Sequence, residues 1–66
     1  MEQSMTNKER YENLMALGDF CLALANREGN RIKKGEENAV VETGFCQMVQ
    51  ATAMAYGAAD ALDAKP

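Results

Sequence analysis

The sequence predicts an all-α protein, an antiparallel helical hairpin that assembles into a homo-oligomeric helix bundle. Helix-forming residues fill two long stretches, which a short glycine-containing segment separates. β-Branched residues are few and do not alternate with polar ones, which argues against strands. With 66 residues, the chain is expected to form one domain, residues 1–66. A domain this small buries only about 60% of its unfolded surface, so a partner subunit is the expected source of further stability.

The first helix is predicted at about residues 7–28. Thr6 and Glu9 match a capping box, in which each side chain accepts a hydrogen bond from the backbone of the other residue. The helix is therefore expected to begin near Asn7. Gly29 and Asn30 are the expected stop residues because both types commonly end helices. Residues 1–5, before the capping box, are expected to be disordered.

The second helix is predicted at about residues 36–62, after a turn spanning roughly residues 29–35. Gly35 precedes Glu36 and Glu37, and two acidic residues in a first turn interact favourably with the helix dipole. The one proline is Pro66, the last residue, so no proline interrupts either helix.

The apolar residues of the first helix cover more surface than one neighbouring helix can bury. A second apolar set lies beside a first stripe with helical spacing, and together they cover about 220° of the helix. One such face therefore predicts at least a dimer that forms a four-helix bundle. The stripe is Tyr11, Leu14, Met15, Gly18, Cys21, Leu22 and Ala25, and the second set is Leu17, Phe20 and Leu24.

The predicted turn is basic and is the best candidate for a binding site. Its four cations are Arg27, Arg31, Lys33 and Lys34. Because backbone amides at a helix start attract anions, this segment is a candidate site for a phosphate, a nucleotide or an RNA backbone. The alternative is a solvated turn whose lysines pair with the two glutamates that follow, which would also repel a bound anion.

Two tyrosines, Tyr11 and Tyr56, complete the candidate ligand-binding set because their rings are suited to stacking on a base. In an antiparallel hairpin Tyr11 is expected towards the level of Tyr56, within a chain or across subunits. The alternative is that each ring packs in the core with its hydroxyl in water.

Cys21 and Cys46 are expected at similar heights along the hairpin, so a disulfide or redox pair is one interpretation. Neither has a C-x-x-C partner or an adjacent base that would lower its pKa. The other interpretation is that both are reduced and pack as small hydrophobic residues. We expect no metal site, since the chain has no His and its methionines form no compact cluster with the cysteines.

Composition and motifs argue against catalysis and against several partners. Without His, a phosphate-binding glycine pattern or G-x-S-x-G, the chain is expected to be neither an enzyme nor a cofactor binder. The net charge of −3 argues against broad nucleic-acid binding. The first ten residues lack the apolar core of a signal peptide, so a cytoplasmic location is expected. The uncharged run at residues 43–59 is too polar for a membrane span.

Length, acidic character and hairpin pattern together resemble the Rop-like plasmid copy-number regulators. That resemblance implies a dimeric four-helix bundle that binds RNA hairpins. The small size and the Ala-rich segment AMAYGAADA, residues 53–61, also resemble phage sponge proteins, which oligomerise and sequester cyclic-nucleotide signals. We therefore expect an oligomeric regulatory protein that acts by protein–protein interaction or inhibition. The alternatives are a phage-type sponge for a nucleotide-like ligand and a Rop-like RNA-binding hairpin.

Overall fold

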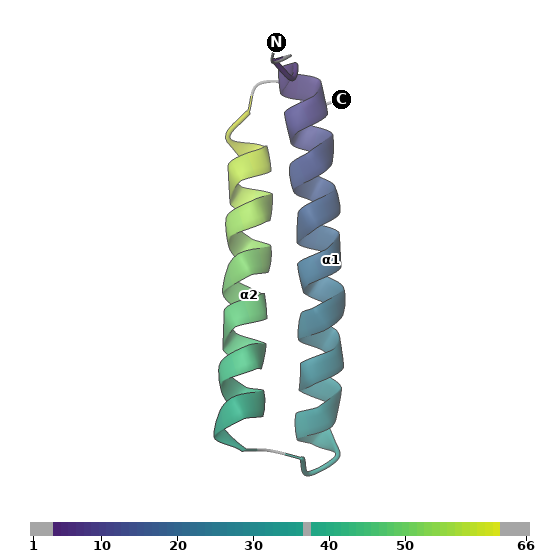
Figure 1. Cartoon of the computed structure of the whole chain (residues 1–66), viewed down its shortest axis with the longest axis vertical. Helices are drawn as coiled ribbons and strands as arrows, with labels where there is room; N and C mark the ends of the chain where they lie inside the picture. Colours follow the sequence, from purple (N-terminus) through teal and green to yellow (C-terminus); the bar gives the residue numbers. More distant parts are fainter. Residues whose placement is uncertain (1–3, 37, 63–66) are drawn as a thin grey trace.

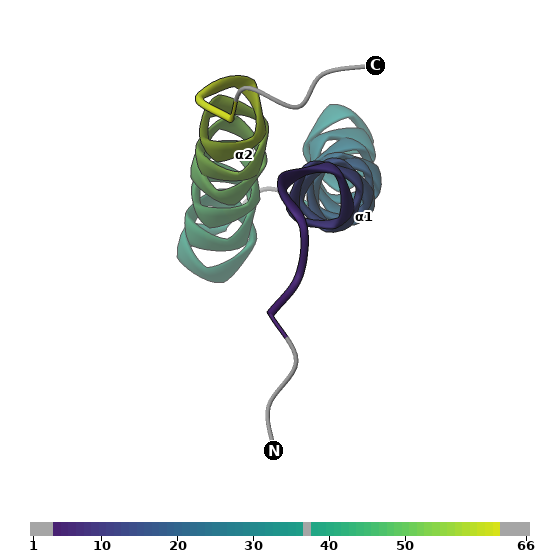
Figure 2. The same cartoon turned by 90° about the horizontal axis from the view of Figure 1, so that it is seen from above.

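The computed structural model describes residues 4–36 and 38–62, which form two helices. Helix α1 spans Asn7–Lys33 and helix α2 spans Ala39–Asp60. The two run antiparallel and lie side by side (Figure 1). Seen from above, the axis of α2 is inclined to the axis of α1 (Figure 2). The described part of the chain contains no strand. The predicted all-α hairpin is confirmed for the single chain.

Helix α1 begins as its capping box predicts. Thr6 Oγ1 accepts a hydrogen bond from the Glu9 backbone N–H at 3.1 Å, and Glu9 Oε1 accepts one from the Thr6 N–H at 2.8 Å. The hydrogen bond from the Thr6 backbone N–H, followed by one from the Thr6 side chain, holds the pKa of the Glu9 carboxyl below its ordinary value. Residues 1–3 of the segment expected to be disordered lie outside the described residues. Met5 is described, and its sulfur accepts a hydrogen bond from Asn13 Nδ2 at 3.1 Å.

Helix α1 does not end at Gly29 and Asn30, and the predicted boundary at residue 28 was wrong. The helix continues through Gly29, over which Phe45 of α2 packs: an added Cβ would lie 3.3 Å from Phe45 Cε1. It ends instead at Lys33, and Gly35, which follows the C-cap residue Lys34, has a φ of 86° in the left-handed region. The Gly35 N–H donates to Ile32 O and the Glu36 N–H donates to Arg31 O, both at 3.0 Å. These bonds form a Schellman motif.

Helix α2 begins later than its glutamates predict. Asn38 is the N-cap, and its Oδ1 accepts a hydrogen bond from the Val41 N–H at 3.0 Å. Glu36 therefore precedes the helix, and Glu37 lies outside the described residues. The helix ends at Asp60, so the predicted range of residues 36–62 was too long at both ends. The connection shrinks accordingly to residues 34–38.

The seam between the helices is built from small side chains. Ala59 is completely buried, and no large side chain in the described part of the chain is fully buried. Small residues allow two helix backbones to approach closely, but they remove little apolar surface from water. The buried residues are Gly18, Cys21 and Ala25 of α1, and Val41, Thr52, Ala55 and Ala59 of α2.

The hairpin has two different faces, one on each side of this seam. On one side the Tyr56 hydroxyl donates a hydrogen bond to Asp19 Oδ1 at 2.6 Å, and we call this side the tyrosine face. The helical rotation of 100° per residue places a second set of residues on the other side, and we call that side the apolar face. It consists of Leu14, Leu17, Phe20 and Leu24 of α1, with Val40 and Met54 of α2 and with Leu62, which follows α2.

Candidate functional site

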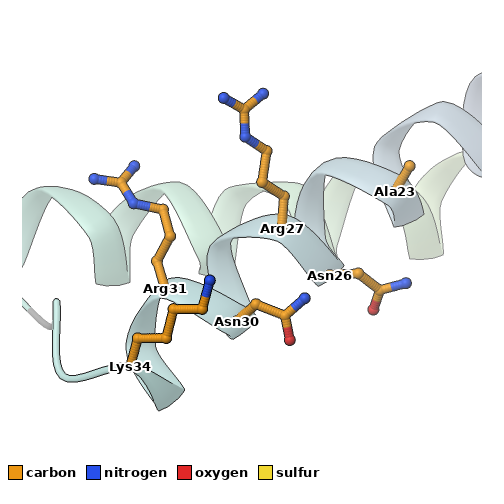
Figure 3. Close-up of a pocket in the computed structure, with 6 residues that line it drawn as sticks. All are labelled: Ala23, Asn26, Arg27, Asn30, Arg31 and Lys34. Carbon is orange, nitrogen blue, oxygen red and sulfur yellow. The ribbon is translucent and has the colours of Figure 1, made fainter.

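A shallow hollow of about 490 Å³ lies over the last three turns of α1. All of its lining residues come from this one helix, at the spacing of residues that share a helix face. The hollow therefore lies on the outer surface of α1 and not in a cleft between the helices. The lining residues are Ala23, Asn26, Arg27, Asn30, Arg31 and Lys34 (Figure 3).

The three cations of this hollow differ in how strongly they are neutralised. Arg31 Nε lies 3.2 Å from Glu36 Oε1, and its Nη1 lies 3.4 Å from Glu28 Oε1. The hydrogen bond to Glu36, followed by the charge of Glu28, raises the pKa of Arg31 above its ordinary value. The side chains of Arg27 and Lys34 form no hydrogen bond or ion pair with residues 4–36 or 38–62.

Figure 3 shows how these groups are arranged. The guanidinium groups of Arg27 and Arg31 extend to the same side, and the ammonium group of Lys34 rises beside Arg31. The amides of Asn26 and Asn30 point to the other side. Arg27 and Lys34, which have no ion-pair partner among the described residues, can each donate hydrogen bonds to a phosphate-bearing anion. Because both cations are exposed, solvent and salt weaken each of these interactions.

Lys33 does not belong to this hollow, although sequence analysis grouped it with the other three cations. Because α1 stays helical to Lys33, neighbouring residues point about 100° apart. Lys33 therefore lies on a different face from Lys34. The same continuation brings Asn26 and Asn30 into the hollow, and the spacing i, i+4 would have identified them had the helix been extended. The start of α2 does not face the hollow, and Asn38 caps it.

The tyrosines also lie away from the basic hollow. The Tyr56 ring covers Gly18, where an added Cβ would collide with it. Gly18 precedes Arg27 by nine residues, about 14 Å along the helix, and Tyr11 is about 10 Å farther from Arg27. Tyr11, which is half-buried, therefore lies about two turns from the level of Tyr56. A single chain does not bring a tyrosine to the four predicted cations.

Asp19 is the hydrogen-bond partner of Tyr56, and the sequence analysis did not predict it. Its carboxylate accepts the hydroxyl hydrogen bond, and this bond is the main reason that the pKa of Tyr56 is raised above its ordinary value of 10.0. The pairing depends on how far α2 is shifted along α1, which the spacing within each helix does not determine.

Both cysteines are free thiols in different environments: Cys21 is buried in the seam and Cys46 is exposed. The packing interpretation therefore holds for Cys21 and was wrong for Cys46. Because Phe45 lies over Gly29, Cys46 is about seven residues, or ~10 Å, from the level of Cys21. Their predicted similar heights were also wrong. No group of three potential metal-binding His, Cys, Asp or Glu residues occurs in residues 4–36 and 38–62.

Two further hollows lie along the apolar face. One of about 380 Å³ joins the N-terminal segment and both helices, and one of about 450 Å³ lies on the first turns of α2. Neither α1 nor α2 is long and apolar enough to span a membrane. The first hollow is lined by Met5, Arg10, Asn13, Leu14, Leu17 and Leu62, and the second by Ala39, Val40, Thr43, Gly44 and Gln47.

No protein-family model, curated protein or solved structure matches this chain. The resemblances to Rop-like regulators and to phage sponge proteins therefore stay expectations. The function has to be inferred from the faces of the hairpin and from the groups on them.

Proposed function

We propose that this chain is a non-enzymatic binding protein that works as a homo-oligomer and acts by protein–protein contact. The apolar face supports the proposal. Large apolar side chains of this face are widely exposed in the single chain: Leu17 by 51%, Phe20 by 62%, Met54 by 73% and Val40 by 81%. The seam meanwhile buries only small residues.

The distribution of these side chains favours association over a purely monomeric fold. Fully burying a Leu, Val, Met or Phe side chain contributes about 1.5–3 kcal/mol. The four exposed side chains thus forgo roughly half or more of that value in a monomer. Exposed apolar residues gathered on one face are typical of an interaction site. Met54 lies close to the level of Phe20, so each helix exposes a large apolar side chain at the same height of the hairpin.

Native mass spectrometry of the untagged protein tests this proposal. We expect a mass that is a whole multiple of the 7.2 kDa chain, together with a concentration-dependent sedimentation coefficient. A 7.2 kDa species at every concentration would contradict self-association. The apolar face would then be free for a different protein.

The basic hollow supports a second candidate function, the binding of a nucleotide-like anion. The supporting observation is that Arg27 and Lys34 have no side-chain partner within the described residues and share one helix face with Asn26 and Asn30. Isothermal titration with ATP tests it. Arg27→Ala should weaken binding at least tenfold, whereas Lys33→Ala should change it little. Equal effects of the two variants would contradict a site at this hollow.

A short RNA duplex tests the Rop-like alternative in the same assay. RNA binding through this face predicts that affinity falls steeply with salt, because phosphate contacts release counterions. Weak binding of both ATP and RNA, unchanged by Arg27→Ala, would leave protein–protein contact as the supported function.

A further inference from the structure

The charges beside the apolar stripe of α1 occur in reversed order at its two ends. Near the start of the helix Glu9 precedes Arg10, and near its end Arg27 precedes Glu28. Residues 9 and 27 are 18 positions apart, as are residues 10 and 28, which is about five full turns. Glu9 and Arg27 therefore lie on one edge of the stripe, and Arg10 and Glu28 lie on the other edge. Leu17, Phe20 and Leu24 lie between these edges, with Asn13 and Arg31 at the two ends of the same strip.

This pattern is complementary to itself. In an antiparallel pair related by a two-fold axis, each edge of one helix faces the same edge of the other. When the axis lies level with Gly18 and Asp19, Arg10 of one copy comes within one residue of the level of Glu28 of the second copy. On the other edge, Glu9 comes within one residue of the level of Arg27. In the seam, Leu17 comes beside Phe20 of the second copy.

We propose that the apolar face binds a second copy of this chain, with the two α1 helices antiparallel and centred at Gly18 and Asp19. The proposal rests on the proposed self-association and specifies its geometry. A parallel pair also places opposite charges near each other, since Glu9 would then face Arg10. It would however bring both basic hollows, each with Arg27, Arg31 and Lys34, to the same end of the dimer. The antiparallel pair separates these like charges and opposes the two helix dipoles.

The contacts within one chain do not prevent this arrangement. Among residues 4–36 and 38–62, Arg10 is held only by a long hydrogen bond from its Nη1 to Asn7 Oδ1, at 3.5 Å. Glu28 contacts Arg31 at 3.4 Å, with the Arg31 side chain exposed and the Glu28 side chain half-buried. Each of these side chains can turn to a second copy at the expense of a weak local contact.

A charge exchange tests the arrangement, with the dimer dissociation constant measured by sedimentation equilibrium. Arg10→Glu and Glu28→Arg should each raise the constant about tenfold, because each substitution acts on two symmetric contacts. The double variant should return to within about threefold of the original protein. Lys8→Glu is the matched control, because it makes the same change in charge on the tyrosine-face side of α1 and should have little effect.

Each outcome separates this arrangement from the broader proposal. If the original protein is monomeric, self-association fails and this arrangement fails with it. If the protein dimerises but the double variant is no tighter than the single variants, self-association stands and the antiparallel arrangement is overturned. A parallel pair predicts this second result, since exchanging the charges would then place Glu9 beside a new glutamate.

Disulfide cross-linking gives a second test that does not depend on charge. Leu17→Cys and Phe20→Cys are made separately, each combined with Cys21→Ala and Cys46→Ser. The antiparallel arrangement predicts that the mixture of the two proteins cross-links faster than either protein alone. Faster cross-linking within each single protein would overturn it. Circular dichroism confirms that every variant is helical before it is compared.

Discussion

The two faces of the hairpin differ in how well their side chains are packed and hydrogen-bonded within one chain. On the tyrosine face, Tyr56 closes over Gly18 and donates its hydroxyl hydrogen to Asp19. That face also exposes Leu22 and Val49, but each is less than half exposed. On the apolar face Phe20 and Met54 are mostly exposed and have no comparable partner among the described residues. The tyrosine face thus joins the two helices, whereas the apolar face leaves large side chains exposed in the single chain.

The largest expected effect comes from removing an aromatic side chain from the apolar face. Phe20→Ser should raise the dissociation constant of the oligomer at least about 20-fold, because burying the 62% of Phe20 that is exposed contributes about 2–4 kcal/mol over the two copies. Val49→Ser is the matched control on the tyrosine face and should change the constant less than fivefold. Sedimentation equilibrium measures both. If the two variants weaken association equally, the two faces do not differ as the comparison requires.

The next largest effect comes from the glycine beneath Tyr56. Gly18→Ala should lower the free energy of unfolding by about 1–2 kcal/mol, since overpacking costs about 1–3 kcal/mol and the better helix propensity of Ala returns up to about 1. Gly57→Ala is the control: open space surrounds that position, so it should raise stability by up to about 1 kcal/mol. Denaturant unfolding at one fixed protein concentration measures both. Stabilisation by both substitutions would show that Tyr56 moves aside without cost.

Features set by neighbouring residues in the chain could be predicted from the sequence. The capping box of Thr6 and Glu9 involves residues three apart, and its position was predicted correctly. The end of α1 was not, because Gly29 lies under Phe45, a residue of the other helix. Gly35, whose left-handed backbone conformation follows the end of the helix, comes directly after two lysines. Basic residues followed by glycine are typical of helix ends. The sequence therefore did contain a signal for the true boundary.

In the candidate site too, the sequence predicted the local features and not the contacts between the helices. Arg27, Arg31 and Lys34 share a hollow because their spacing along a helix is local, whereas Lys33 was grouped with them only because a turn was expected there. The bond between Tyr56 and Asp19 joins residues 37 positions apart. Such a contact depends on the shift of α2 along α1, and the periodicity of either helix alone is consistent with several shifts.

Removing a helix cap should have a smaller effect. It should change the stability of the hairpin without changing association through either face. Thr6→Ala and Asn38→Ala each remove a side-chain acceptor from a helix start and should each lower the free energy of unfolding by about 1 kcal/mol. Ser4→Ala, before the cap of α1, is the control and should have no effect. Urea unfolding measures the three. A rise in the dissociation constant of the oligomer on removing a cap would contradict the separation of folding from association.

The smallest expected effect is on the pKa of Tyr56, because it concerns the single hydrogen bond between Tyr56 and Asp19 on the tyrosine face. In the Tyr11→Phe background, the ultraviolet absorbance of tyrosinate reports Tyr56 alone, and its pKa should lie above the ordinary value of 10.0. Asp19→Asn should lower that pKa, since it replaces the charged acceptor with a neutral amide oxygen and removes a negative charge that disfavours tyrosinate. Because the folded-state pKa is the higher one, the contribution of this bond is fully present below pH 10 and is lost as the pH rises through the folded-state pKa. An unchanged pKa in Asp19→Asn would show that Asp19 does not hold Tyr56 across the seam. The closure of this face would then depend on the packing of the ring over Gly18, which the alanine substitution there measures separately.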